Sequence, residues 1–410
     1  MTLLEILQRS ELLPPGERVL VGCSGGGDSL ALAHALSLVR PGQVEAAVVD
    51  HGVREGSLDE ARAVAALLDS WHIPSAVLSP VPETEGSPED RLRRQRLGAL
   101  AAYARSRGIG RIVLAHHARD QLETILMRLM RGTGLEGLSG MKACRPLDAT
   151  CLLVRPLLTC PPEWLEAHAR AHGLTPWEDP TNRDRRIPRN RIRLDALPAL
   201  TSLNPAWPGN LASMVSRWQD EEAFLQARAT EALERLHPRH LEGLMAWRQE
   251  TFQQMDPVLQ RRILRLATRE VGRLLHDLDS AMIERLRTDA SPLADVGQGL
   301  RVERRYGWFV LAHGHGPAPT DPRLRRCDPD TDLFRPPGRT CMRTLRHHLA
   351  RRRIPWLVQE RLWVLARDGC VLAVMGGPLA GEVATDLATI ERPQSGWPGE
   401  TWFDKGGGPP

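Results

Sequence analysis

A glycine-rich loop near the N-terminus carries the residues best suited to bind phosphate. Between a predicted strand and a predicted helix stand Ser24, Gly25, Gly26, Gly27, Asp28 and Ser29. Three glycines let the backbone approach a ligand closely, and the N–H groups that open a helix attract anions. The two serine hydroxyls can donate further hydrogen bonds. The alternative is a glycine turn in which Asp28 or Ser29 only caps the helix.

Asp28 narrows the kinds of ligand that this loop is predicted to bind. The loop lacks the Gly-Lys-Ser/Thr ending of a Walker loop, and it does not match the Gly-x-Gly-x-x-Gly pattern of dinucleotide sites. A carboxylate beside bound phosphates would repel them unless a cation lay between the two. Asp28 therefore predicts Mg²⁺ at this loop, since Mg²⁺ is bound by carboxylate and phosphate oxygens in such sites.

Strands and helices are predicted to alternate through the first half of the chain. The strands are continuous apolar runs, which indicates a parallel sheet covered by helices on both faces. Ligands bind such sheets at the carboxyl ends of the strands. Polar clusters follow three strands, at 24–29, 50–54 and 116–123, and are expected to meet there. The predicted strands are 18–23, 44–49, 75–79 and 111–115, and the predicted helices are 29–39, 58–71 and 89–107.

Two arginine-dense stretches indicate a nucleic-acid partner. Residues 183–193 contain one acid and residues 339–353 contain none, although the net charge of the chain is only +4. Arginine suits phosphate because its planar fork donates two parallel hydrogen bonds. A solvated surface explains either stretch alone, but two stretches beside a phosphate-binding loop favour nucleic acid. The predicted RNA contacts are Arg189, Arg191, Arg193, Arg346, Arg351, Arg352 and Arg353.

The composition of the 410 residues excludes several classes of protein. No apolar run reaches roughly 18 residues, so no membrane span is predicted. The N-terminus lacks the pattern of a secretory signal, and a cytoplasmic location is expected. The seven cysteines are scattered without a Cys-x-x-Cys pair, which argues against a disulfide framework or a cysteine zinc site. A homodimer is left open.

The pattern changes after about residue 205. Residues 209–290 are expected to be helical without strands, and a β-like segment, 300–311, closes this region. A predicted linker, 312–321, leads to a last module with a basic helix at 342–352 and strands such as 370–375. The predicted domains are 1–205, 206–312 and 322–392, followed by a loose tail, 393–410.

The loop and the motifs after it resemble the N-type ATP pyrophosphatases, and among these the tRNA(Ile)-lysidine synthetases. Ser-Gly-Gly-x-Asp-Ser resembles their PP-loop, and Asp50-His51-Gly52-Val53-Arg54 is similar to their DHGLR segment. Arg119 stands where the family usually has an acid or an amide. The resemblance spans about 18–390 and is strongest in 18–200. Further matches lie at Glu89, Arg93 and Arg96, at 115–124, 131–138, 155–158, 178–182 and 189–191, and at Phe334, Pro337, Leu345 and 354–356.

The resemblance implies a fold, a reaction and a set of site residues. The fold would be a doubly wound, adenine nucleotide α-hydrolase-like α/β domain, followed by a helical domain and a small α+β domain. ATP would activate the wobble cytosine of a CAU-anticodon tRNA(Ile), and free L-lysine would then displace AMP. The loop 24–29 would bind ATP with Asp50, His51 and His117, and Asp28 and Asp120 would bind Mg²⁺. The implied catalytic residues are Asp28, Asp120, Glu123, Arg93 and Arg96.

The block 116–123 and the helix 89–107 have simpler explanations as well. Asp120 and Glu123 could form a helix cap with its return partner. His116 and His117 are a poor metal pair, because adjacent histidines point to different sides and no third ligand is evident. Arg93 and Arg96 lie about one turn apart and could be a solvated helix face.

Two other functions are weighed against the ligase. A PP-loop tRNA 2-thiolation enzyme would usually need catalytic or cluster-binding cysteines, often as Cys-x-x-Cys, and the chain has no such pair. A non-catalytic RNA-binding protein with a decayed ATP site is favoured only by Arg119. The intact loop with Asp28 argues against it.

Overall fold

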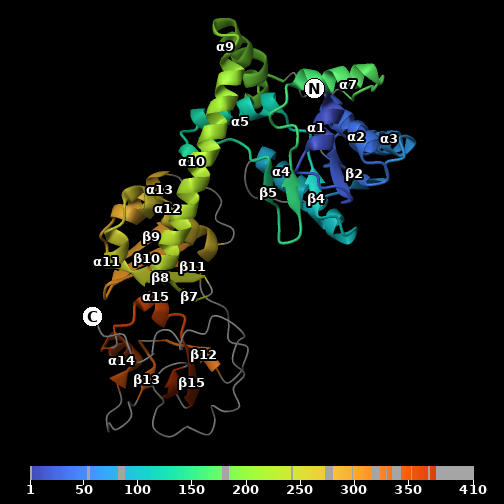
Figure 1. Cartoon of the computed structure of the whole chain (residues 1–410). Helices are drawn as coiled ribbons and strands as arrows, with labels where there is room; N and C mark the ends of the chain where they lie inside the picture. Colours follow the sequence, from blue (N-terminus) through green and yellow to red (C-terminus); the bar gives the residue numbers. More distant parts are fainter. Residues whose placement is uncertain are drawn as a thin grey trace. The chain divides into compact units, whose positions relative to one another are not determined.

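The chain forms two compact units, Met1–Glu222 and Ala223–Pro410 (Figure 1). A computed structural model describes residues 2–52, 56–81, 88–177, 184–241, 243–272, 280–297, 299–314, 324–328, 330–334, 343–351, 353–367 and 370–374. The predicted tail 393–410, the whole motif at 178–182, Pro337 and Arg352 lie outside the described residues. The three predicted domain boundaries stay predictions.

The first unit is built on a six-stranded sheet in the order β3-β2-β1-β4-β6-β5. All neighbouring strands pair in parallel except the edge strand β5, which runs antiparallel to β6. The four predicted strands are present, each ending within two residues of the prediction, and the predicted α/β class is confirmed. The strands are β1 (Val19–Cys23), β2 (Val44–Val49), β3 (Ser75–Leu78), β4 (Arg111–Val113), β5 (Cys144–Pro146) and β6 (Leu152–Val154).

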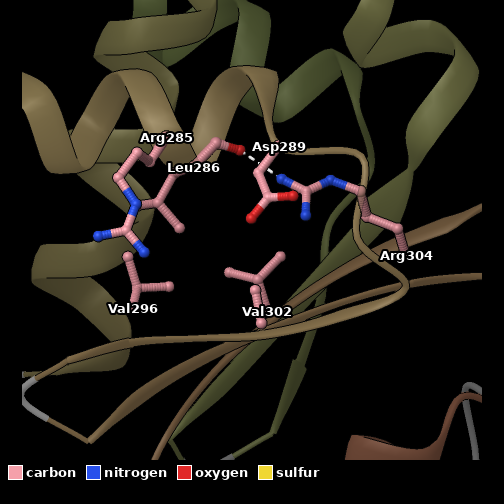
Figure 2. A pocket seen from close by; sticks show the side chains of 7 residues that line it. Arg285, Leu286, Asp289, Val296, Val302 and Arg304 are labelled. Atoms are coloured by element: carbon pink, nitrogen blue, oxygen red, sulfur yellow. Dashed lines mark hydrogen bonds between the residues drawn. The ribbon is translucent and has the colours of Figure 1, made fainter.

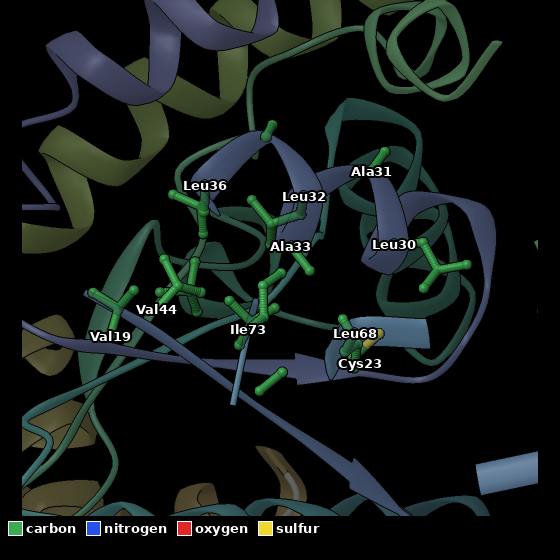
Figure 3. Close-up of a cluster of buried hydrophobic side chains, with 14 of the residues drawn as sticks. Val19, Cys23, Leu30, Ala31, Leu32, Ala33, Leu36, Val44, Leu68 and Ile73 are labelled. Carbon is green, nitrogen blue, oxygen red and sulfur yellow. The ribbon is translucent and has the colours of Figure 1, made fainter. Parts of the chain in front are cut away.

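Helices cover both faces of this sheet. Successive strand residues point to opposite sides, and both sets of side chains are apolar and must be buried. Val19 and Val21 belong to one buried cluster (Figure 3), and Leu20 between them belongs to another. The first cluster includes α2, which is apolar on most sides because it packs against the sheet, α1 and α7. The helices are α1 (Leu3–Arg9), α2 (Gly27–Val39), α3 (Ser57–Ser70), α4 (Pro88–Ser106), α5 (Ala118–Met130), α6 (Leu135–Leu138), α7 (Pro162–Ala171), α8 (Pro188–Arg191) and α9 (Leu197–Leu203), with a π-helix, η2 (Ile192–Ala196), and the long α10 (Trp207–Arg235).

The second unit contains a five-stranded antiparallel sheet in the order β7-β8-β11-β10-β9. The prediction that 209–290 holds no strand is wrong at β7 and β8. β8 is a short apolar run buried along four of its five residues, and hydrophobic periodicity cannot separate such a strand from a buried helix segment. The elements are β7 (Arg239–Leu241), β8 (Leu244–Arg248), α11 (Gln249–Gln253), α12 (Pro257–Val271), α13 (Ser280–Thr288), β9 (Leu293–Gly297), β10 (Leu300–Arg305) and β11 (Trp308–His313).

A small cavity in this unit lies between α13 and the sheet (Figure 2). Its wall is tied together by Arg304, whose guanidinium donates to the carbonyl oxygen of Leu286 at 2.5 Å. None of the predicted site residues lines it. The lining residues are Arg285, Leu286, Asp289, Ala294, Val296, Val302 and Arg304.

A second sheet in the same unit has the order β12-β15-β16-β13-β14. The predicted basic helix 342–352 is present as α14, which begins only at Leu345 because Arg343 and Thr344 pair in strand β14, and the predicted strand 370–375 is confirmed as β16. One buried cluster joins Ala246 and Val310 of the first sheet to Leu349 and Leu357 of this module. The elements are β12 (Leu324–Arg326), β13 (Leu333–Phe334), β14 (Arg343–Thr344), α14 (Leu345–Arg351), α15 (Trp356–Gln359), β15 (Trp363–Arg367) and β16 (Cys370–Val374).

Glu303 connects the two sheets of the second unit. This buried β10 side chain accepts hydrogen bonds from the backbone N–H groups of Trp356, at 2.8 Å, and Leu357, at 2.7 Å. Burial raises the pKa of Glu303, against the lowering effect of these two hydrogen bonds. The carboxylate therefore satisfies two of the orphan N–H groups that begin α15.

We expect Glu303→Ala to destabilise the second unit by about 2–4 kcal/mol, because two backbone N–H groups lose their acceptor. Urea unfolding and faster amide exchange at Trp356 and Leu357 would measure the loss. Glu360→Ala is the control, since it removes only a partly exposed ion pair with Arg301 and should cost about 1 kcal/mol or less. Equal losses in the two variants would contradict this role of Glu303.

Candidate active site

The loop 24–29 is held in one conformation by Ser29. The buried Ser29 hydroxyl accepts from the backbone N–H of Ser24 at 3.1 Å and donates to the carbonyl oxygen of Gly26 at 2.9 Å. Gly25 has φ +80°, and a Cβ added there would lie 2.6 Å from a Val64 methyl carbon. Ser29 therefore shapes the loop from within, while the exposed Ser24 hydroxyl lies at the surface.

The loop opens α2 without a side-chain cap. Gly26 is the N-cap residue and makes no side-chain hydrogen bond, so the first N–H groups of the helix have no cap acceptor. These groups and the helix dipole make the loop an anion site. The segment after α7 also holds the loop in place. The backbone N–H of Trp177 donates to the carbonyl oxygen of Gly25 at 2.9 Å. Sequence reasoning did not assign a role to Trp177, and only this contact reveals it.

His117 brings Asp28 and Asp120 together. Its Nδ1 accepts from the backbone N–H of Arg119 at 3.2 Å, which leaves Nε2 as the protonated nitrogen in the neutral form. Nε2 lies 3.4 Å from Oδ2 of Asp28 and 3.5 Å from Oδ2 of Asp120. Asp120 also accepts from the His117 backbone N–H at 3.0 Å. The helix cap considered for Asp120 and Glu123 is therefore formed three residues earlier, by His117 and Asp120.

These contacts shift the pKa values of His117 and Asp120. Burial by itself lowers the pKa of His117, but the hydrogen bond to Asp28 and the charges of Asp120 and Asp28 outweigh it and raise the pKa. Burial by itself raises the pKa of Asp120, but the charges of His117 and Arg189 and the hydrogen bond from the His117 backbone outweigh it and lower the pKa. Two carboxylates thus face one imidazole beside the anion-binding loop, an oxygen-rich arrangement that fits Mg²⁺.

Glu123 is fully buried and paired with two arginines. Arg189 Nε donates to one carboxylate oxygen at 2.6 Å, and Arg193 Nε donates to the other at 2.7 Å. Arg189 also donates to Asp120 at 2.9 Å. The sequence assigned these acids to catalysis and these arginines to RNA, whereas the structure joins them in one cluster. Arg189 and Arg193 are four residues apart and share a helix face, whereas Arg191 between them is exposed.

His116 is a neutral, buried imidazole. Its Nδ1 accepts from Arg155 Nε at 3.1 Å, and Arg155 also donates to the carbonyl oxygen of Lys142 at 2.8 Å. Burial lowers the pKa of His116 to about 3, and the charges of Arg155 and Arg96 add to this effect. Arg155 itself is 2% exposed. A guanidinium this deeply buried had no signal in the sequence beyond its place in the Arg-Pro-Leu-Leu motif.

Several arginines near this site in the first unit lie close enough to lower one another's pKa. Burial lowers the pKa of Arg96, Arg145 and Arg155, the last to about 10, and the charge of Arg93 lowers all three further. Arg189 adds to the field at Arg96. Mutual repulsion of this kind is relieved by a bound anion, so the cluster is suited to phosphate.

His51, a predicted ATP-binding residue, and Arg96, a predicted catalytic residue, each leave one buried nitrogen unsatisfied in the described part of the chain. Nδ1 of His51 and Nε of Arg96 have no hydrogen-bond partner among the described residues. Asp50 is held by the backbone N–H of Gly52 at 2.9 Å, and this bond lowers the pKa of Asp50. Buried unpaired polar atoms are uncommon, and these two lie on residues assigned to the site.

The remaining predicted residues are at the surface. Arg93, Arg351 and Arg353 are exposed. Arg346 pairs with Asp330 at 2.6 Å. Arg119 makes a long, exposed contact of 3.8 Å with Glu166, an ion pair worth little in water. The side chain of Glu89 lies outside the described residues.

We expect the His117 imidazole to titrate above its ordinary value of about 6.5, and Asp28→Asn to lower this midpoint. The stability that His117 contributes is therefore complete below about pH 6.5 and is lost as pH rises through the folded-state pKa. Histidine NMR titration measures both midpoints, and His116 is the internal control, because it should stay neutral in both proteins. An unchanged His117 midpoint in Asp28→Asn would contradict the contact.

Comparisons with known proteins show the family of this chain. The family model of a PP-loop domain matches residues 3–200. The tRNA(Ile)-lysidine synthase of Symbiobacterium thermophilum is 34% identical over 76% of this chain and 68% of its own length. That of Salinispora tropica is 38% identical over 72% of this chain and 91% of its own length. The solved U34-tRNA thiolase NcsA of Methanococcus maripaludis is 16% identical with a TM-score of 0.43, covering 52% of this chain and 76% of that one, a likeness that carries no argument.

The two synthases are matched over more than two thirds of their own length at 34% and 38% identity. The matched PP-loop domain contains the loop 24–29 together with His117, Asp120 and Glu123. This chain belongs to the tRNA(Ile)-lysidine synthase family.

Proposed function

We propose that this chain ligates free L-lysine to C2 of the wobble cytosine, C34, of tRNA(Ile) with a CAU anticodon. ATP would first adenylate the cytosine and release pyrophosphate, and lysine would then displace AMP to give lysidine. The observation that carries the proposal is the pair Asp28 and Asp120 around His117, at the mouth of an intact anion-binding loop. The proposed substrates would place the reaction in the cytoplasm. No described helix is long and apolar enough to cross a membrane.

The loop would hold the triphosphate during the first step. The uncapped N–H groups of α2 and the exposed Ser24 hydroxyl would donate to phosphate oxygens. Asp28 and Asp120 would hold Mg²⁺, which offsets the charge of the leaving pyrophosphate. The field of Arg93, Arg96 and Arg145 would stabilise the same charge. Electrostatic positioning of this kind is the main contribution of protein groups in phosphoryl transfer.

Glu123 would act as a positioning residue in this scheme. Its two oxygens accept three hydrogen bonds from Arg189 and Arg193, and its side chain has no exposed surface, so it is unsuited to bind a metal ion beside the loop. Asp120 accepts two hydrogen bonds, and 13% of its side chain is exposed. Arg189 bridges Glu123 to Asp120, and Asp120 holds His117. The fully buried acid would thus fix the side chains that face the ligand. In the second step the amine of lysine must be neutral, and its proton would pass to a carboxylate or to water.

The cysteines disfavour the thiolation alternative. A catalytic cysteine needs a thiolate, and burial raises the pKa of Cys23 and of Cys160. Among the described residues of the first unit, the other cysteines, Cys144 and Cys151, are half-buried or buried and none forms a disulfide. We therefore retain the ligase as the proposed function.

Incubation with ATP, Mg²⁺, labelled lysine and a CAU-anticodon tRNA transcript tests the proposal. We expect ATP-dependent transfer of lysine to the RNA, and a fall of roughly a hundredfold or more in Asp28→Ala with tRNA affinity retained. Asp59→Ala, an exposed acid on α3, is the matched control and should leave transfer unchanged. Transfer of sulfur or ammonia in place of lysine, or full activity of Asp28→Ala, would overturn the proposal.

Arg191 and Arg193 separate RNA contact from structural support. Arg191→Ala should weaken tRNA binding and lower its salt dependence by about one ion, because an exposed arginine would be lost from a phosphate contact. Arg193→Ala should instead lower stability by about 1.5–3 kcal/mol, because Glu123 loses charged hydrogen bonds. Filter binding at several salt concentrations and urea unfolding measure the two effects. Identical behaviour of the two variants would contradict the assignment.

A further inference from the structure

Three histidines converge between α2 and α7. His34 lies on α2, His168 lies in the last turn of α7, and His172 is the C-cap residue that ends this helix. One nitrogen from each ring can be chosen so that all three lie within 4.8 Å of one another. Nδ1 of His34 and Nε2 of His168 are already 3.0 Å apart. None of the three belongs to the proposed catalytic site.

The fold places them together for reasons unrelated to catalysis. His168 and His172 are four residues apart, which puts them on one face of α7. The same spacing lets two histidines of one helix bind a single zinc ion in other proteins. α7 packs against α2, and the His34 ring lies with its centroid 5.2 Å from that of His168 and 4.7 Å from that of His172.

The spacing of the histidine nitrogens suits a metal ion with tetrahedral coordination. Zinc binds imidazole nitrogen at about 2.0–2.1 Å, so neighbouring ligand nitrogens in a tetrahedron are about 3.3 Å apart. The His34–His168 pair is close to this spacing. His172 is exposed, so its side chain can turn the remaining distance, whereas His168 is 8% exposed and fixed by packing. Three protein nitrogens leave a fourth position for water.

The chemistry of the donors selects the class of ion. The cluster has three imidazoles and no carboxylate among the described residues. Imidazole suits zinc and neighbouring transition metals, whereas Mg²⁺ and Ca²⁺ require oxygen ligands. Burial lowers the pKa of His34, and that of His168 to about 4, so protons do not compete for these two nitrogens near neutral pH.

We propose that His34, His168 and His172 bind a divalent transition-metal ion, zinc by preference, as a structural clamp between α2 and α7. Both helices lead to the loop 24–29. α2 begins there, and the chain after α7 returns to donate the Trp177 N–H to Gly25. The clamp fixes these two supports of the loop relative to each other. It is separate from the proposed Mg²⁺ site at Asp28 and does not depend on the proposed reaction.

Metal binding by the full chain, free of any affinity tag and stripped with a chelator, tests the proposal. We expect one Zn²⁺ or Co²⁺ per chain by elemental analysis, a visible Co²⁺ spectrum of a tetrahedral site, and a raised unfolding temperature. A large excess of Mg²⁺ should neither displace the ion nor reproduce the effect.

Variants assign the ion to the cluster. His168→Gln and His172→Gln should each weaken binding at least tenfold and abolish the tetrahedral Co²⁺ spectrum. His240→Gln, an exposed histidine on β7, is the matched control and should bind like the original chain. Because His172 is exposed, His172→Gln tests the site even if His168→Gln fails to fold. Absence of stoichiometric binding, meaning a metal-free hydrogen-bonded trio of imidazoles, overturns the proposal, as does binding unchanged in His172→Gln.

Discussion

A fully buried carboxylate, Glu123, imposes the main constraint on the site. An unpaired charge in such a place would cost several kcal/mol, so the side chain requires cationic partners. Arg189 and Arg193 supply them, and their short helices pack on α5 through Leu122 and Ile192. The cluster fixes the orientation of α5, and with it the residues that begin this helix.

A series of contacts, one between each pair of neighbouring residues, connects Glu123 to the loop 24–29. Arg189 joins Glu123 to Asp120, Asp120 caps the helix at His117, and His117 faces Asp28. The parallel sheet makes this possible, because the carboxyl ends of β1 and β4 lie side by side. The loop 24–29, which follows β1, and the start of α5, which follows β4, therefore meet at one edge of the sheet. The charge of each residue in this network affects the pKa of its neighbours. The network raises the pKa of His117 and lowers that of Asp120.

The two units hold their arginines in different ways. The first concentrates positive charge around Arg96, Arg145 and Arg155, where burial keeps the guanidinium groups from full hydration. The second unit joins two sheets through one apolar cluster and the buried Glu303. Arg351 and Arg353 are exposed in the module that contains the second of these sheets. Phosphate contacts made by exposed arginines orient a nucleic acid without reading its sequence.

The sequence by itself determined the four strands β1 to β4, the helices α2, α3 and α4, the loop 24–29 and the identity of the acids at the site. These features follow from local periodicity and from motifs within a few residues. Only the tertiary structure decided which charges pair, since Arg189 and Glu123 are 66 residues apart and His34 and His168 are 134 apart. Local patterns carry no information about such distances. For the same reason β8 escaped prediction, because burial on both faces erases the alternation that marks a strand.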